Sequence, residues 1–126
     1  MRIEQLAHVN IRTTQLDVMI DWYTNILGLK SGRRPTFSFP GAWMYAGENP
    51  FVHLVGIKGP AAVGAEVKLK LEHFSLAASG GTEFVAKLEA EGIKYHRAEI
   101  EDFNLCLINI WDPDGNHIHV DFFLDE

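Results

Sequence analysis

The two halves of this 126-residue chain repeat one another at a nearly constant spacing. Three positions in the first half have counterparts in the second half, at offsets of 65, 64 and 66 residues: His8 and His73, Gly28 and Gly92, His53 and His119. The surrounding sequences agree as well, since AHVNI matches EHFSL, ILGLK matches AEGIK, and VHLV matches IHVD. Because similarity at a fixed offset is the signature of duplicated structure, each half is expected to form the same supersecondary unit.

The first half is predicted to form one strand, one helix and three more strands. Residues 3–11 alternate enough for a strand, and Thr14 to Asp17 are typical of a capping-box helix start. An apolar stripe at three- and four-residue steps then predicts the helix: Leu16, Met19, Ile20, Tyr23 and Leu27. Gly28 is expected to end it. Three extended segments follow, near 30–39, 42–47 and 51–57, with a turn at Pro40-Gly41.

The second half is predicted to repeat this plan. A strand is expected at 69–77, followed by a helix with Thr82 as its cap and Gly92 as its terminator. The helix buries Phe84, Val85 and Leu88. Three strands follow, near 94–100, 104–111 and 117–123, and the turn before the last is Asp112-Pro-Asp-Gly-Asn116.

The expected fold class is therefore α+β, with two βαβββ modules forming a curved mixed sheet around a cleft. The length suits one domain. Its parts are module one at 1–57, a linker rich in Gly, Ala and Pro at 58–68, and module two at 69–126.

Composition excludes several classes of function. The formal charge of -6 argues against nucleic-acid binding, which needs a basic patch. Apolar runs are far shorter than the roughly 20 residues of a membrane helix, and no signal peptide is recognisable, so a cytoplasmic location is expected. Cys106 is the only cysteine, which excludes an intramolecular disulfide and a cysteine-rich zinc site. Any metal site must use nitrogen and oxygen ligands.

Strand alternation places the polar residues of three strands on one face. His8, Asn10 and Arg12 share a face of the first strand, as do His73 and Ser75 later, and His117, His119 and Asp121 in the last strand. The opposite faces are apolar and should pack against the helices, because burying each such side chain is worth about 1.5–3 kcal/mol. The register then turns the histidines towards the cleft.

Four histidines at repeated positions predict a metal site formed by His8, His53, His73 and His119. Several buried imidazoles without a metal would stay neutral or repel one another, whereas a divalent ion such as zinc, nickel, iron or manganese resolves the conflict. The other two histidines are weaker candidates. His96 lies on a charged strand and is expected at the surface, and His117 is a candidate for a supporting or substrate-binding group. Asp121 could orient a ligating imidazole or act as a base.

At these residues the sequence resembles the vicinal oxygen chelate superfamily, which includes glyoxalase I, extradiol dioxygenases and metal-free bleomycin-resistance proteins. The resemblance covers nearly the whole chain, through AHVNIRT, DWYTNILGLK, FPGAWMYAGENPFVHL, LEHFSL, EGIKY and DPDGNHIHVDF. It implies the same four ligand positions, and Arg12 matches an arginine that binds glutathione in glyoxalase I. It also implies a homodimer. The sequence departs from the family at His119, where family enzymes commonly carry Glu, and at His53, where they carry Glu or Gln.

Three functions remain open. The first is a glyoxalase-type lyase or isomerase that chelates two adjacent substrate oxygens and forms an enediolate, with Arg12 and Arg33 or Arg34 holding an anionic tail. His119 or His53 would serve as the base by leaving the metal, or Asp121 would take the role. The second is an iron dioxygenase acting on a catechol-like ring against an aromatic wall made of Phe37, Phe39, Trp43 and Tyr45. The third is a drug-binding protein without catalysis. Asn10, Ser75 and His117 complete the expected substrate contacts.

Overall fold

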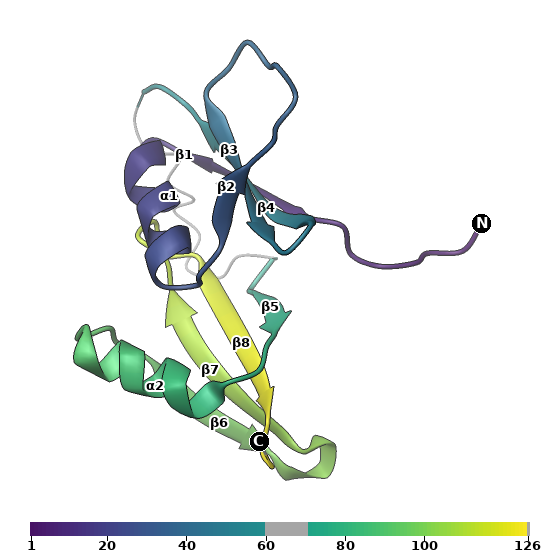
Figure 1. Ribbon diagram of the computed structural model, residues 1–126, viewed down its shortest axis with the longest axis vertical. Coiled ribbons are helices and arrows are strands. Elements are labelled where there is room, and N and C mark those ends of the chain that lie inside the picture. The colour runs from purple at the N-terminus through teal and green to yellow at the C-terminus, as the bar shows by residue number, and fades with distance from the viewer. Residues whose placement is uncertain (60–70, 126) are drawn as a thin grey trace. The chain divides into compact units, whose positions relative to one another are not determined.

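The computed structural model describes residues 1–59 and 71–125 (Figure 1). The chain divides into two compact units, Met1–Ala65 and Glu66–Glu126, each of which is described by itself. Most of the linker expected at 58–68 lies outside the described residues. Within the described ranges, neither α-helix is long and apolar enough to cross a membrane.

Unit 1 forms a four-stranded mixed sheet with one helix. In chain order its elements are β1 (Val9–Thr13), α1 (Leu16–Asn25), β2 (Lys30–Gly32), β3 (Gly41–Ala46) and β4 (Asn49–Gly56). The strands lie in the order β1-β4-β3-β2. The first strand is parallel to β4, and the other two pairings are antiparallel. Helix α1 contacts β2, β3 and β4 (Figure 1).

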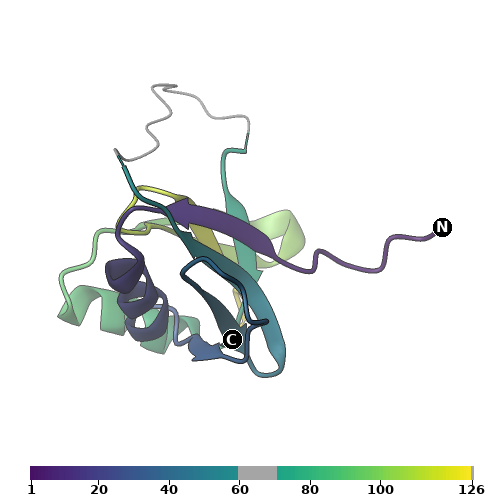
Figure 2. The same cartoon turned by 90° about the horizontal axis from the view of Figure 1, so that it is seen from above.

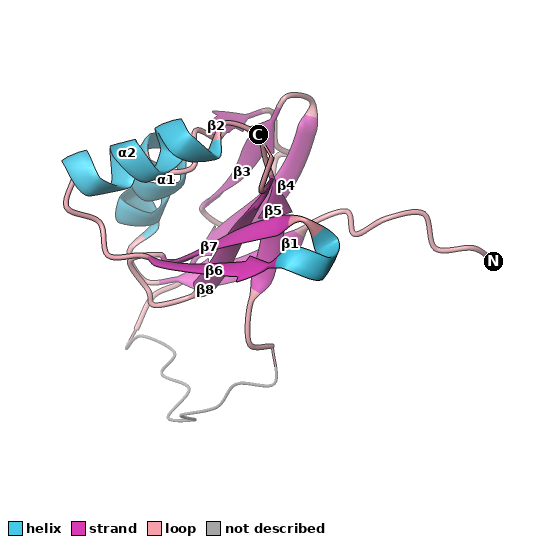
Figure 3. Ribbon diagram, turned by 90° about the horizontal axis from the view of Figure 1, so that it is seen from below, coloured by secondary structure: helices cyan, strands magenta, loops and turns pink. Residues whose placement is uncertain are grey.

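Unit 2 has the same connectivity. Its elements are β5 (Phe74–Ala77), α2 (Gly81–Ala90), β6 (His96–Ile100), a short 3-10 helix (Glu101–Phe103), β7 (Leu105–Trp111) and β8 (His117–Phe123), coloured by type in Figure 3. The strand order is β5-β8-β7-β6, with β5 parallel to β8. The predicted pair of βαβββ modules is therefore confirmed, and each module carries its own four-stranded sheet among the described residues.

The apolar faces of the strands form the two cores, as the alternation predicts. In unit 1, Met19 and Tyr23 of α1 are fully buried together with Met44, Val52 and Leu54 of the sheet. In unit 2 the buried hydrophobic residues lie in the helix and the two central strands: Leu88, Cys106, Ile108, Ile110, Ile118, Val120 and Phe122. Since buried and partly exposed residues alternate along β8, His117 and His119 lie on the face opposite this core.

The ends of several elements differ from the sequence predictions. The strand expected at 3–11 begins only at Val9, and the preceding residues extend away from β1 (Figure 2). Thr14 does not cap α1; the hydroxyl of Thr13 accepts the Gln15 N–H at 3.0 Å, and Gln15 is the cap residue, with no capping hydrogen bond from its side chain. A local turn therefore replaces the capping box.

The start of α2 is also displaced from its prediction. Thr82 lies inside the first turn, and Gly80 with φ +81° is the cap residue. The predicted helix ends are confirmed, because Gly28 and Gly92 have φ of +70° and +66°. At the end of α2, Ile93 N–H donates to the Leu88 carbonyl at 2.8 Å, as in a Schellman motif.

Candidate metal centre

His53 lies at the centre of a stack of three rings in unit 1. Its imidazole is parallel to that of His8, with ring centroids 3.9 Å apart, and to the indole of Trp43, with centroids 4.0 Å apart. The register explains the arrangement, because β4 lies between β1 and β3 and Trp43 pairs directly with His53. The ring is 6% exposed, whereas His8, just before β1, is exposed. The structure thus brings two of the predicted ligands of unit 1 together.

Hydrogen bonding fixes which nitrogen of His53 is free. Its Nε2 atom is buried and has no hydrogen-bond partner. A backbone hydrogen bond with Pro50 must therefore use Nδ1, and because proline has no N–H, His53 is the donor. Burial lowers the pKa of His53, the neighbouring charge of His8 lowers it further, and the Pro50 carbonyl opposes both effects. The neutral ring consequently presents an Nε2 lone pair, the form in which imidazole binds metals.

The predicted substrate-binding residues of unit 1 surround this stack unevenly. Asn10 pairs with His53 across the sheet, and both Asn10 and Arg12 are exposed on β1. Trp43 packs on His53, while the Tyr45 hydroxyl donates to the backbone carbonyl of Arg33 at 2.5 Å. These two aromatic side chains are half-buried.

Phe39 lies in the loop before β3. Its ring is parallel to that of Phe37, with centroids 4.8 Å apart, and both are 42% exposed. The guanidinium of Arg34 lies over both rings and donates to the Phe39 carbonyl at 2.9 Å. Phe39 also lines an open cavity of about 830 Å³ beside the start of α1.

Unit 2 gathers three histidines. The rings of His73 and His119 are parallel, with centroids 3.8 Å apart, and His117 lies at 5.4 Å from the first and 4.8 Å from the second. One ring nitrogen from each lies within 4.8 Å of the others. Burial lowers the pKa of His119, followed by the charges of His73 and His117, while Asp121 and Glu72 partly offset these effects. His96 is exposed on β6, as predicted.

Two residues of this cluster were missed by the sequence reasoning. The two carboxylate oxygens of Glu72 are hydrogen-bonded to Nδ1 of His73 and to Nδ1 of His117, the latter at 2.9 Å. These two bonds, that to His73 first, lower the pKa of the exposed Glu72 carboxyl. The second missed residue is Asn109, whose Oδ1 lies 2.8 Å from Nε2 of His117. The sequence does contain a signal for Asn109, because it is the polar residue in the otherwise apolar run LCLINIW.

Asp121 and Ser75 form a pair on the same face as His119. The hydroxyl of Ser75 donates to Oδ2 of Asp121. Oδ1 of Asp121 is buried and has no hydrogen-bond partner. Ser75 of β5 pairs with His119 of β8, and Ala77, two residues further along β5, pairs with Asp121. This register brings Ser75 close to Asp121. Asp121 thus has one fixed carboxylate oxygen and one oxygen able to accept a proton.

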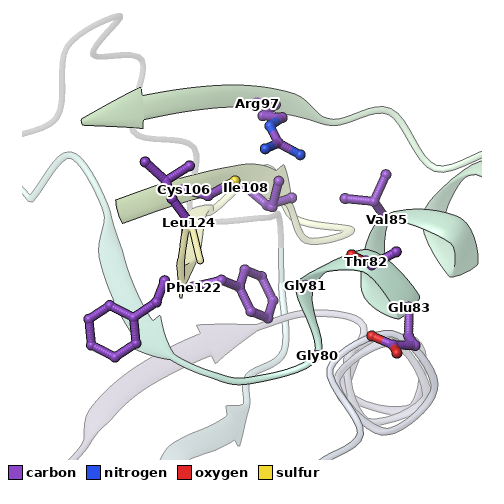
Figure 4. Close-up of a pocket in the computed structure, with 11 residues that line it drawn as sticks. Gly80, Gly81, Thr82, Glu83, Val85, Arg97, Cys106, Ile108, Phe122 and Leu124 are labelled. Atoms are coloured by element: carbon purple, nitrogen blue, oxygen red, sulfur yellow. The ribbon is translucent and has the colours of Figure 1, made fainter. Parts of the chain in front are cut away.

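A cavity of about 260 Å³ in unit 2 does not belong to the histidine cluster (Figure 4). It lies between α2 and the sheet, where Arg97, Cys106 and Phe122 face the start of the helix. Phe122 lies on the opposite face of β8 from His119, since neighbouring strand residues point to opposite sides.

The donor atoms present fit a divalent ion of the borderline class. Imidazole nitrogens dominate both clusters, and the oxygens near the histidines of unit 2 include the carboxylates of Glu72 and Asp121, a set that suits zinc, nickel or iron. The buried, unpartnered Nε2 of His53 is the most direct sign, because a buried lone pair without a partner is unfavourable unless an ion or proton occupies it.

Comparison with known proteins agrees with the fold. The profile of the Glyoxalase/Bleomycin resistance protein/Dioxygenase superfamily matches residues 5–120. Glyoxylase I 4 of Arabidopsis thaliana is 28% identical over an alignment of 125 residues, which covers 95% of this chain and 71% of that protein.

Solved structures of the same fold include two bacterial proteins. A glyoxylase/bleomycin resistance protein/dioxygenase domain from Frankia sp. EAN1pec is 21% identical, with a TM-score of 0.72 and coverage of 97% of this chain and 99% of that chain. Lactoylglutathione lyase from Agrobacterium tumefaciens is 17% identical, with a TM-score of 0.70 and coverage of 95% and 94%. Since the superfamily profile spans most of the sequence, this chain belongs to the Glyoxalase/Bleomycin resistance protein/Dioxygenase superfamily.

Proposed function

We propose that this chain is a divalent-metal-dependent lyase or isomerase of the glyoxalase type, acting on a small substrate with two adjacent oxygens. The proposed ligands are His8 and His53 of unit 1 and His73 and His119 of unit 2. The observation that carries the proposal is the buried Nε2 of His53, which has no hydrogen-bond partner. Similarity to a glyoxylase I protein over 95% of the chain supports the same class of chemistry.

The bound ion would supply charge to hold the two substrate oxygens and to stabilise the enediolate. The protein would supply the base. Asp121 suits this role better than His53 or His119, because its Oδ1 can accept a proton while Ser75 holds Oδ2, and the imidazoles stay available as ligands.

Substrate binding is proposed for the exposed polar face of β1 and its aromatic neighbours. Arg12 would bind an anionic group by charge-assisted hydrogen bonds, with Asn10 beside it. Trp43 and Tyr45 would contact an apolar portion of the substrate. Arg33 and Phe39 are the proposed substrate contacts from the loop before β3, and Ser75 and His117 are those from unit 2. A homodimer and a cytoplasmic location complete the proposal, and sedimentation analysis tests the dimer.

The first test is metal content of protein purified without an affinity tag. We expect stoichiometric zinc, nickel, iron or manganese in the wild type and in His96→Ala, and a large loss in His8→Ala, His53→Ala and His119→Ala. Normal metal content in all three ligand variants would end the proposed ligand set. Protein that takes up none of these ions would instead favour a metal-free binding protein.

The second test is activity with each reconstituted metal. Hemithioacetal turnover without oxygen consumption is expected, and Asp121→Asn should abolish turnover while metal content remains normal. Oxygen uptake with a catechol and no hemithioacetal turnover would replace the lyase by the dioxygenase. Absence of both reactions with every metal would refute catalysis of either kind.

A further inference from the structure

The Glu72 carboxylate joins two histidines of unit 2. One oxygen, Oε2, is bonded to Nδ1 of His73, the residue that follows it in the chain. The other, Oε1, lies 2.9 Å from Nδ1 of His117, which is 45 positions further along at the start of β8. The carboxylate therefore connects the segment leading into β5 with its parallel neighbour β8.

His117 is itself fixed from the other side by a buried residue. The side-chain N–H of Asn109 donates to the backbone carbonyl of His96 at 3.1 Å, so its Oδ1 is the atom that faces His117, at 2.8 Å from Nε2. Asn109 is 8% exposed, and the ring of Trp111 lies parallel to that of His117, with centroids 5.1 Å apart. Because Oδ1 only accepts, Nε2 of His117 carries a hydrogen.

This arrangement argues against His117 as a metal ligand. Its nitrogen lies within 4.8 Å of ligand atoms of His73 and His119, which makes a three-imidazole site conceivable. Both of its ring nitrogens, however, already face acceptors, Asn109 Oδ1 and Glu72 Oε1. Binding an ion through either nitrogen would require it to displace one of these two oxygens from His117.

We propose that Glu72 is a positioning residue that holds His73 in the tautomer with hydrogen on Nδ1, leaving the Nε2 lone pair for the metal. His117 and Asn109 support the carboxylate, and His117 is not a ligand. Hydrogen bonding from a carboxylate to the far nitrogen of an imidazole fixes its tautomer and increases its strength as a ligand. The role in metal binding rests on the proposed function, whereas the tautomer of His73 does not.

The tautomer can be measured without metal. Long-range proton–nitrogen spectra of the metal-free protein at about pH 8, above the ordinary imidazole range, report which nitrogen carries the hydrogen. We expect Nδ1–H for His73 in the wild type and in Glu91→Gln, an exposed glutamate used as control. Glu72→Gln should weaken this preference, and Glu72→Ala should remove it. An Nε2–H tautomer of His73 in the wild type overturns the proposal.

The zinc affinity tests whether Glu72 strengthens metal binding. Glu72→Gln is expected to raise the zinc Kd about 10–100-fold with unchanged stoichiometry, a typical effect of altering such a supporting group. His117→Ala should also raise Kd but keep the stoichiometry, His73→Ala should lose the site, and His96→Ala should resemble the wild type. The metal-free melting temperature should be unchanged in Glu72→Gln, which separates positioning from a structural role.

The outcomes distinguish the two proposals. An unchanged zinc Kd in Glu72→Gln refutes the positioning role while leaving the metal centre intact. Loss of stoichiometry in His117→Ala, equal to that in His73→Ala, makes His117 a ligand and also refutes it. A wild type that binds no zinc, nickel, iron or manganese refutes the proposed function, and the tautomer measurement then still decides the role of Glu72.

Discussion

Replacing His53 by leucine tests whether this histidine binds a metal or stabilises the fold. The side chain is almost fully buried, and its neighbours along β4, Val52 and Leu54, are completely buried on the other face. A structural histidine in this position would be destabilising to remove. A metal ligand, by contrast, holds an unfavourable lone pair in the metal-free state, so His53→Leu should not weaken the metal-free protein.

The magnitude follows from the two ring nitrogens. Removing the buried Nε2, which has no partner, relieves about 1–3 kcal/mol, while losing the Nδ1 bond to the Pro50 carbonyl costs about 0.5–1.5 kcal/mol. Pro50 is half-buried, so water can reach its carbonyl. The metal-free variant should therefore have a stability between about 0.5 kcal/mol below and about 2.5 kcal/mol above that of the wild type. Leu54→Ala, the matched control, should lose about 2–5 kcal/mol through its cavity.

Thermal unfolding with and without metal measures both effects. At about 4 °C per kcal/mol for a chain of this size, Leu54→Ala should melt roughly 8–20 °C lower than the wild type. Metal at 100 times its Kd should add about 2.7 kcal/mol, or roughly 11 °C, to the wild type and to Leu54→Ala. His53→Leu, if it binds 100-fold more weakly, should gain only about 0.4 kcal/mol. A metal-free loss as large as that of Leu54→Ala, with a full metal response, would refute the reasoning.

Three further predictions concern the turns and the cysteine. Gly28→Ala should lower the free energy of unfolding, measured by urea titration, by about 1 kcal/mol. The cause is the φ of +70° alone, because a Cβ at this position meets no atom within 4 Å. An unchanged free energy of unfolding would contradict backbone strain at this position. Asp112→Ala should lose about 2 kcal/mol and Asp112→Asn less, since the side-chain oxygen of Asp112 accepts the N–H groups of Asp114 and Asn116 and asparagine keeps an acceptor oxygen; equal losses in the two variants would contradict this role of hydrogen-bond acceptance. Burial raises the pKa of Cys106 above the ordinary 9.0, so this thiol should react with iodoacetamide at pH 8 far more slowly in folded than in urea-unfolded protein. Equal labelling rates in folded and unfolded protein would contradict the burial of Cys106. The contribution of the neutral thiol to stability is present below about pH 9, and it is lost as the pH rises through the pKa of Cys106 in the folded protein.

The sequence predicted the fold because two periodic signals agree with each other. The 65-residue repeat defines the order of elements, and the alternation along β8 separates Ile118 from His119. Helix starts were less predictable, since a threonine near a helix start forms a cap only if the backbone turn suits it. Thr13 accepts the Gln15 N–H in place of the expected cap at Thr14, and Gly80 replaces Thr82 through a positive φ.

The same repeat identified the four histidines, which were predicted as one site. The structure places them as one pair in each unit, between parallel neighbouring strands. His53 lies beside His8, and His119 lies beside His73, with nearly equal ring separations of 3.9 and 3.8 Å. Equivalent positions in a duplicated fold have equivalent neighbours, so pairing in one unit implies pairing in the other. That reasoning fixes where the imidazoles lie, but not what holds each ring.

The supporting residues escaped prediction because the two units differ there. Trp43 pairs with His53 in unit 1, and the corresponding partner of His119 in unit 2 is Asn109. At the repeat offsets, Ala7 corresponds to Glu72 and Phe51 to His117. Unit 1 therefore holds its histidine by ring stacking and a backbone carbonyl, whereas unit 2 uses a carboxylate supported by an amide. Similarity between the halves reveals the shared ligand positions, and it necessarily hides a network that only one half possesses.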